Sequence, residues 1–170
     1  MKAILRCDGG CRPSNPGPAA CAWVIKAPNG DLIAQGSKFI GHATNNVAEY
    51  FGLIGGLACA LRHGVTDLMV VSDSKLVTQQ MNQSYRVKHA GLRILWQQAK
   101  ELASQFRAIV FAWQRRANNH EADALCTAEI EAHKAEVDVP FPGDLQMPEE
   151  YRIGEGIQMS MRREGWWGRA

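Results

Sequence analysis

Short apolar runs separated by turn-forming residues occupy the first forty positions of the chain. Runs of this length, bounded by Gly, Pro, Asn and Asp, are typical of β-strands. The third run follows the tetrapeptide Pro-Asn-Gly-Asp at residues 28–31, whose Asn-Gly pair is a strong hairpin signal. We therefore expect an antiparallel meander of three strands, at Ala3–Cys7, Ala19–Ala27 and Leu32–Ile40.

A helical period of apolar positions begins at Asn46 and ends at His63 and Gly64. The apolar positions are Val47, Tyr50, Phe51, Ile54, Leu57, Ala58 and Leu61. Three glycines inside this segment lower its intrinsic helix propensity, so tertiary packing must hold the helix. We expect Gly52, Gly55 and Gly56 to let it approach the sheet closely.

The second half of the chain alternates strand-like and helical segments. Leu68–Val71 is a continuous apolar run, which predicts a strand buried on both faces and parallel to the first strand. The remaining pattern predicts helices at Lys75–Asn82, Ala90–Phe106 and Asn119–Lys134, with a fifth strand at Ala108–Gln114. Strands first and helix-strand units afterwards indicate an α/β protein with a mixed sheet.

The periodicity fails after about Glu136, so we expect a domain at 1–136 followed by a C-terminal tail at 137–170. The tail is rich in Pro and acidic residues and ends in a segment with three Arg and two Trp. We expect it to pack on its own domain or to form a homodimer. The alternative is that Trp166 and Trp167 stack on nucleic acid.

Length and charge limit the possible functions. A chain of 170 residues can bury a single core without disulfides. The N-terminal apolar run is too short for a signal peptide, and no segment approaches the roughly 20 apolar residues of a membrane span, so we expect a cytoplasmic protein without membrane contact. Residues 1–136 carry 15 Lys and Arg against 11 Asp and Glu, a balance compatible with a polyanionic partner.

The five cysteines are an odd number, and four of them lie within apolar segments. We therefore expect buried free thiols rather than disulfides, although Cys11 lies in a polar loop where it could be exposed. A zinc site at Cys7, Cys11 and Cys21 would lack a fourth ligand nearby in the sequence.

Four acidic residues stand at positions where local structure alone could explain each of them. Asp8 precedes two glycines and could form a turn. Glu49 follows Asn46 at the spacing of a capping box. Asp73 could cap the next helix, and Asp123 could interact favourably with the dipole at the start of the last helix.

Together the four acids indicate a metal site. Asp8 and Asp73 follow strands that would be neighbours where the sheet order reverses, the usual ligand position in open α/β sheets. Glu49 and Asp123 lie near helix starts that could line the same edge. Clustered carboxylates repel one another unless cations neutralise them. All-oxygen ligands favour Mg²⁺ or Mn²⁺ over zinc, and two such ions roughly 3.5–4 Å apart support phosphodiester hydrolysis.

Four segments resemble, in order, the motifs of the ribonuclease HI family, and the resemblance covers residues 1 to about 134. The segments are DGGCRPSNPGPAACAWVI, TNNVAEYFGLIGGLACAL, SDSKLV and RRANNHEADAL. The resemblance implies a ribonuclease H-like fold with a five-stranded mixed sheet in the order 3-2-1-4-5, flanked by helices. It also implies cleavage of the RNA strand of RNA–DNA hybrids, such as R-loops or primers, to 5′-phosphate and 3′-hydroxyl ends. By the same resemblance the metal-binding catalytic acids are Asp8, Glu49, Asp73 and Asp123.

Further positions match substrate contacts of that family. Asn15, Asn45 and Asn46 could bond a hybrid in its minor groove, where the 2′-hydroxyl distinguishes RNA from DNA. The alternative for each is turn or cap chemistry.

The chain resembles the compact archaeal and bacterial branch of the family, because only a short segment separates the second and third predicted helices. That segment leaves no room for the basic protrusion of longer relatives. Its Tyr85, Arg86 and Lys88 could contact the DNA strand instead, or form an ordinary solvated loop.

A cation beside the last acid would assist at the scissile phosphate. We favour Arg116 over His120, because Arg stays charged and binds phosphate in a bidentate manner. Two rival hypotheses remain. One keeps the fold and acts on another substrate, as transposases and junction resolvases do, and the other is a non-catalytic hybrid-binding module.

Overall fold

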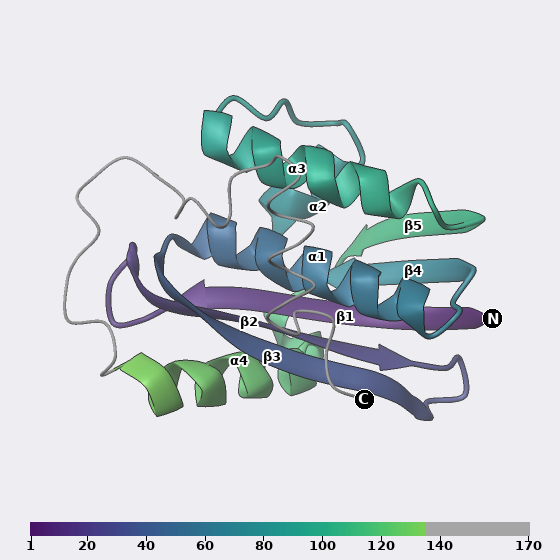
Figure 1. The fold of residues 1–170 in the computed structure, drawn as a ribbon, viewed down its shortest axis with the longest axis horizontal. Coiled ribbons are helices and arrows are strands. Elements are labelled where there is room, and N and C mark those ends of the chain that lie inside the picture. The colour runs from purple at the N-terminus through teal and green to yellow at the C-terminus, as the bar shows by residue number, and fades with distance from the viewer. Residues whose placement is uncertain (135–170) are drawn as a thin grey trace.

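The computed structural model describes residues 1–134, which form a five-stranded sheet with helices on both faces (Figure 1). The strand order is β3-β2-β1-β4-β5, with β1 antiparallel to β2 and parallel to β4. This confirms the predicted mixed sheet and its order. The strands are β1 (Lys2–Cys11), β2 (Gly17–Lys26), β3 (Leu32–Ala43), β4 (Asp67–Ser72) and β5 (Ala108–Trp113). The tail predicted over residues 137–170, with its predicted packing or homodimer, lies outside the described residues.

The helices divide between the two faces of the sheet. The main apolar core joins one face to α1, α2 and α3, and a smaller cluster of β2 and α4 residues lies on the other face (Figure 1). The helices are α1 (Asn45–Arg62), α2 (Lys75–Met81), α3 (Ala90–Ala103) and α4 (His120–His133), with a 3₁₀ turn, η1 (Arg116–Asn118), before α4.

The glycines of α1 bring that helix directly onto the sheet, which confirms their predicted role. A Cβ on Gly52 would lie 2.4 Å from the carbonyl oxygen of Asp8. Gly55 and Gly56 face Trp23 and Leu5 at 2.5 Å in the same way. Because native interiors leave no space for such overlaps, only glycine permits this separation.

Two details of the strands differ from the prediction. Strand β1 does not end at Cys7 but runs on to Cys11, because residues 8–11 pair with β2 despite their turn-forming glycines. The prediction that β4 is buried on both faces is wrong at Met69, whose side chain is 46% exposed. Met69 lies between Ile4 and Val110 of the flanking strands, whereas α4 packs mainly on β1, β2 and β3.

All five cysteines are buried free thiols, as predicted for four of them. Cys11 is not exposed, because the extended β1 places its sulfur within 3.4 Å of the Oδ1 atoms of Asn15 and Asn45. No helix within residues 1–134 combines the length and apolar character needed to span a bilayer.

Candidate metal and nucleic-acid site

Asp8 lies within β1 rather than in a turn, so the turn explanation for this residue is wrong. It pairs with Ala22 of β2, and it is only 4% exposed. Two residues further on, Gly10 still pairs with Ala20. A buried carboxylate in the middle of a strand supports no turn and needs another explanation.

The Glu49 side chain lies close to Asp8 because α1 packs tightly against β1. Thr44 is the N-cap, and its Oγ1 accepts a hydrogen bond from the backbone N–H of Val47 at 3.3 Å. The capping-box explanation for Glu49 is therefore wrong. A Cβ on Gly9 would lie 2.3 Å from the backbone nitrogen of Glu49, so this glycine sets the separation of the two acids.

Asp73 follows β4 and does not cap α2. Ser74 takes that role, because its Oγ accepts a hydrogen bond from the backbone N–H of Val77 at 3.3 Å. The Asp73 backbone is held by Trp113, whose Nε1 donates to the Asp73 carbonyl oxygen at 3.1 Å. The Asp73 side chain therefore has no role in capping α2.

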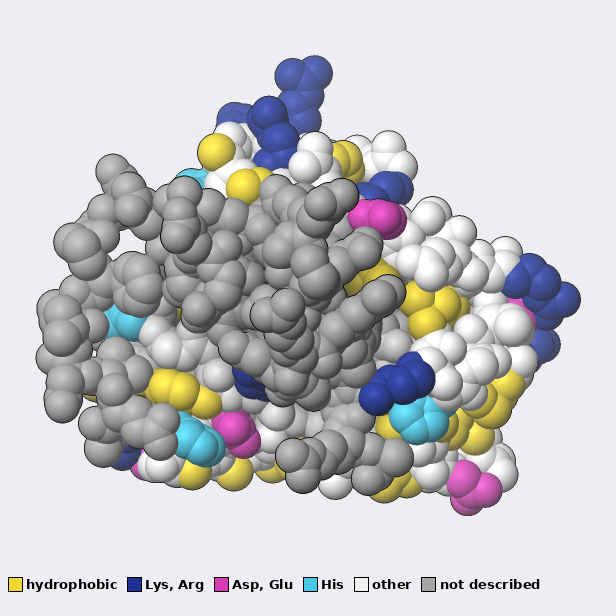
Figure 2. All heavy atoms as spheres, in the orientation of Figure 1, with side chains coloured by type: hydrophobic (Ala, Val, Ile, Leu, Met, Phe, Trp, Pro, Cys, Tyr) yellow, Lys and Arg dark blue, Asp and Glu magenta, His cyan; other side chains and the backbone are white. Residues whose placement is uncertain are grey.

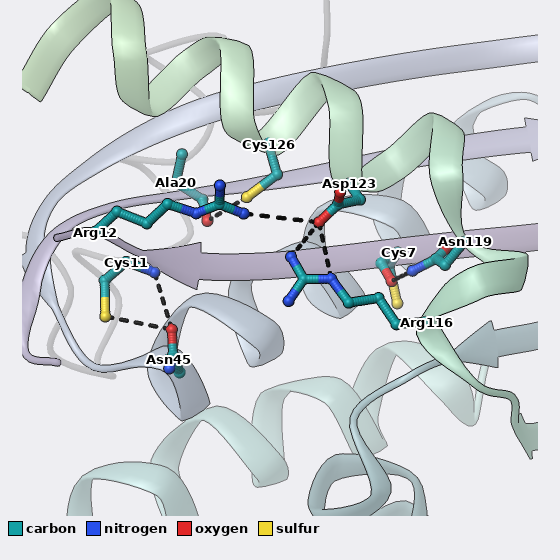
Figure 3. Close-up of polar contacts among 9 residues, drawn as sticks. All are labelled: Cys7, Cys11, Arg12, Ala20, Asn45, Arg116, Asn119, Asp123 and Cys126. Atoms are coloured by element: carbon teal, nitrogen blue, oxygen red, sulfur yellow. Dashed lines mark hydrogen bonds and ion pairs between the residues drawn. The ribbon is translucent and has the colours of Figure 1, made fainter. Parts of the chain in front are cut away.

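One carboxylate oxygen from each of Asp8, Glu49 and Asp73 lies within 4.8 Å of the other two. Asp123 stands outside this group of three. It lies in the first turn of α4 and pairs with two arginines, Arg116 and Arg12 (Figure 3). The structure thus brings all four predicted acids to one region, where the fourth, Asp123, forms ion pairs with two arginines.

The three clustered carboxyls hold protons more tightly than ordinary carboxyls do. Burial, followed by the charges of Asp73 and Asp123, raises the pKa of Asp8 to about 7. Burial, followed by the charges of Asp8 and Asp73, raises the pKa of Glu49 well above its usual value. Burial also raises the pKa of Asp73, while the charge of Arg116 lowers it. A bound cation would remove this penalty.

The donor set fits a hard divalent cation. Glu49 Oε2 and Asp73 Oδ1 are buried and have no hydrogen-bond partner among the described residues. Buried charged oxygens without partners are costly, and a metal ion would satisfy both. A site of carboxylate oxygens alone suits Mg²⁺ or Mn²⁺.

Arg116 lies where the sequence predicted a cation beside the last acid. Its Nη2 and Nε donate hydrogen bonds to Asp123 Oδ1, the latter at 3.1 Å. The bond to Asp123 is the main cause of the raised pKa of Arg116. The rival cation, His120, is an exposed side chain at the first position of α4.

The three predicted asparagines lie beside this region, at the start of α1 and in the loop after β1. Asn45 Oδ1 accepts a hydrogen bond from the backbone N–H of Cys11 at 2.9 Å. Asn15 Oδ1 accepts one from the backbone N–H of Asn45 at 3.1 Å. Both side-chain oxygens therefore fix the local fold, while Asn45 and its neighbour Asn46 remain exposed.

Tyr85 and Lys88 lie apart from the acids, in the eight-residue connection between α2 and α3. Both side chains are exposed. Tyr85 also lines a hollow of about 290 Å³ together with Arg86, Arg93 and Trp96. Figure 2 shows Lys and Arg side chains gathered at the upper edge, over α3 and the loop before it. The short connection predicted from the sequence is confirmed.

Two polar residues of the site were absent from the predicted set. Asn119 is 1% exposed, and its Nδ2 donates to the carbonyl oxygen of Cys7 at 2.9 Å, which ties the start of α4 to β1 beside Asp8. Its position in the sequence, four residues before Asp123, could have indicated that it belongs to the site. Arg12 carried no such signal, because its contact with Asp123 spans 111 positions of the chain.

Comparison with protein families shows a match of residues 6–129 to a model described as reverse transcriptase-like. The bifunctional protein Rv2228c of Mycobacterium tuberculosis is 47% identical over 133 residues, which cover 78% of this chain and 36% of the relative. Ribonuclease HI of Halobacterium salinarum is 38% identical over 124 residues, covering 73% and 62% of the two chains. This chain thus spans about a third of the length of the mycobacterial relative.

Comparison with solved structures also finds similar proteins. The N-terminal RNase H domain of Rv2228c has a TM-score of 0.78 and 44% identity, covering 80% of this chain and 98% of that one. RNase H1 of Halobacterium salinarum has a TM-score of 0.75 and 36% identity, covering 78% and 99%. LC11-RNase H1, solved in complex with an RNA/DNA hybrid, has a TM-score of 0.73 and 32% identity, covering 76% and 97%.

Proposed function

Because the chain belongs to the ribonuclease H family, we propose that it is an endoribonuclease that cuts the RNA strand of RNA–DNA hybrids. One observation carries the proposal: a buried carboxylate and two partly buried ones converge within 4.8 Å although none of them supports a turn or caps a helix. Such a cluster destabilises the protein unless it binds cations. The proposed metal ligands are Asp8, Glu49, Asp73 and Asp123.

Two Mg²⁺ ions, or Mn²⁺ in their place, would supply the positive charge that favours in-line hydrolysis to 5′-phosphate and 3′-hydroxyl ends. The three clustered acids would hold this charge from β1, α1 and the loop after β4. Asp123 would join them from α4 after exchanging its arginine partners. Arg116, which remains beside it, would then bind the scissile phosphate or the leaving oxygen.

The hybrid specificity is proposed from side chains next to the acids. The Oδ1 atoms of Asn15 and Asn45 accept hydrogen bonds from backbone N–H groups of the protein. Their amide N–H groups, and the side chain of Asn46, would then face the minor groove and its 2′-hydroxyls. LC11-RNase H1, which shares the fold, was solved with an RNA/DNA hybrid. Tyr85 and Lys88 would contact the DNA strand.

We propose a catalytic domain at residues 1–136, which contains the matched range 6–129, and a tail at 137–170. R-loops or replication primers in the cytoplasm are the proposed physiological substrates. A homodimer formed through the tail remains a proposal, which light scattering on a chain truncated after Glu136 would test.

One cleavage assay tests the proposed function. A labelled RNA–DNA hybrid, double-stranded RNA and duplex DNA are each incubated with the protein and Mg²⁺. We expect the RNA strand of the hybrid alone to be cut, and we expect Asp8→Asn to abolish cutting while Asp31→Asn, an exposed hairpin acid, leaves it intact. Cleavage of duplex DNA instead would favour a transposase-like or resolvase-like activity, and binding without metal-dependent cleavage would favour a binding module.

A further inference from the structure

Arg12 is the second arginine beside Asp123, the acid that stands outside the group of three. Its Nη2 is 3.9 Å from Asp123 Oδ1, and its side chain is 46% exposed. Figure 3 shows the two arginines reaching the same carboxylate from different directions, one from the loop after β1 and the other from the turn before α4.

The backbone that carries Arg12 is fixed in place. Its N–H donates to the carbonyl oxygen of Pro18 at 2.9 Å. The preceding N–H, that of Cys11, donates to Asn45 Oδ1 at 2.9 Å. Arg12 therefore stands between the asparagines at the start of α1 and the carboxylate of Asp123, while its guanidinium remains accessible to solvent.

Stability gives no sufficient reason for this placement. An exposed ion pair at 3.9 Å contributes little to folding, because water and salt screen it. Asp123 already accepts hydrogen bonds from Arg116, a closer cation. A cation bound at Asp123 would also repel the Arg12 guanidinium and free it for an anion in the same place.

We propose that Arg12 binds a phosphate of the RNA strand beside the scissile position, between the asparagine contacts and the acids. The inference rests on the proposed function, because it assumes a hybrid whose RNA strand runs past both groups. A guanidinium suits this role, since it stays charged and matches a phosphate with two parallel hydrogen bonds. In the free protein, Asp123 holds the guanidinium near the position where the phosphate arrives.

Binding is measured by fluorescence anisotropy at several salt concentrations, with Mg²⁺ and in an Asp73→Asn background that prevents cleavage. Each phosphate contact contributes about 0.7–0.9 to the slope of log affinity against log salt, so its loss at 0.1 M salt lowers affinity roughly five- to eightfold. We expect this loss and this change of slope for Arg12→Gln, and substantial recovery for Arg12→Lys. In the chain that retains Asp73, we expect Arg12→Gln to raise KM more than it lowers kcat.

Arg107→Gln is the matched control, because its partner Asp67 begins β4, at the opposite end of that strand from Asp73. Equal slopes and KM values for the two Gln variants would overturn the proposal. So would a lower melting temperature of Arg12→Gln with an unchanged slope, which would mark a structural role. An equal loss of affinity for duplex DNA would overturn the assignment to the RNA strand.

These outcomes separate the inference from the proposed function. If the unmodified chain fails to cut the hybrid, the proposed function fails. If it cuts the hybrid normally and Arg12→Gln binds with unchanged affinity and slope, the role of Arg12 alone is wrong.

Discussion

The separation of α1 from β1 at Gly9 predicts that a single methyl group there would disable the site. A Cβ on Gly9 would lie 2.1 Å from the carbonyl carbon of Ala48 and 2.3 Å from the backbone nitrogen of Glu49. The atoms that it meets belong to the backbone, so no side-chain rotation relieves the overlap. In Gly9→Ala, the start of α1 must therefore move away from the sheet and carry Glu49 with it.

The size of the effect follows from these distances. Ordinary contacts begin near 3.4 Å, so α1 must move by roughly 1 Å. Overpacking of this kind costs about 1–3 kcal/mol, which lowers the melting temperature by roughly 2–12 °C. Metal–ligand distances tolerate only about 0.2 Å, and a misplacement of about 1 Å can cost roughly 100-fold in rate. We therefore expect a larger loss of activity than of stability.

The neighbouring glycine provides the control. A Cβ on Gly10 would meet only Asn45 Oδ1, at 3.8 Å, so Gly10→Ala should keep both the melting temperature and the activity. Both variants are compared by calorimetric unfolding, by Mg²⁺ titration and by hybrid cleavage at a temperature where each is folded. Equal Mg²⁺ affinity and cleavage for Gly9→Ala and Gly10→Ala would refute the reasoning.

The structure supports three other predictions. The pKa of Asp8 rises from 3.8 to about 7 on folding, so metal-free protein should lose on the order of 4 kcal/mol of stability between about pH 4 and pH 7. Melting curves should show this loss, and Asp8→Asn should flatten it, whereas identical profiles would contradict the burial argument. Asn45→Asp keeps the acceptor for Cys11 but adds negative charge, so its melting temperature should hold while hybrid affinity falls in an anisotropy titration. A thiol reagent should find almost no reactive cysteine in native protein and all five after denaturation, because every sulfur is buried.

Local pattern was enough to predict the type of nearly every element. The Asn-Gly pair at 29–30 marked the β2–β3 hairpin, and the helical period after Asn46 marked α1. These predictions succeed because apolar spacing records which side of an element is buried, and this is a local property. The strand order did not come from spacing, since it followed from resemblance to a family.

The features that failed depend on partners distant in sequence. Gly9 and Gly10 read as a turn, but β2 supplies pairing partners that keep them in a strand. Met69 read as buried, but α4 crosses the sheet too far from β4 to cover it. The ion pair between Arg12 and Asp123 was equally beyond the pattern, because 111 positions of the chain separate the two residues.

The acids of the site are explained by what their neighbours do. Thr44 caps α1, Ser74 caps α2, and β1 continues through Asp8, so the local structural roles open to three of the acids belong to other residues or are absent. These three carboxylates raise one another's pKa or are buried without partners, which costs folding free energy. A cation bound among them would remove this cost. Asp123 differs, because its arginines already compensate its charge, so a cation bound there would have to compete with them.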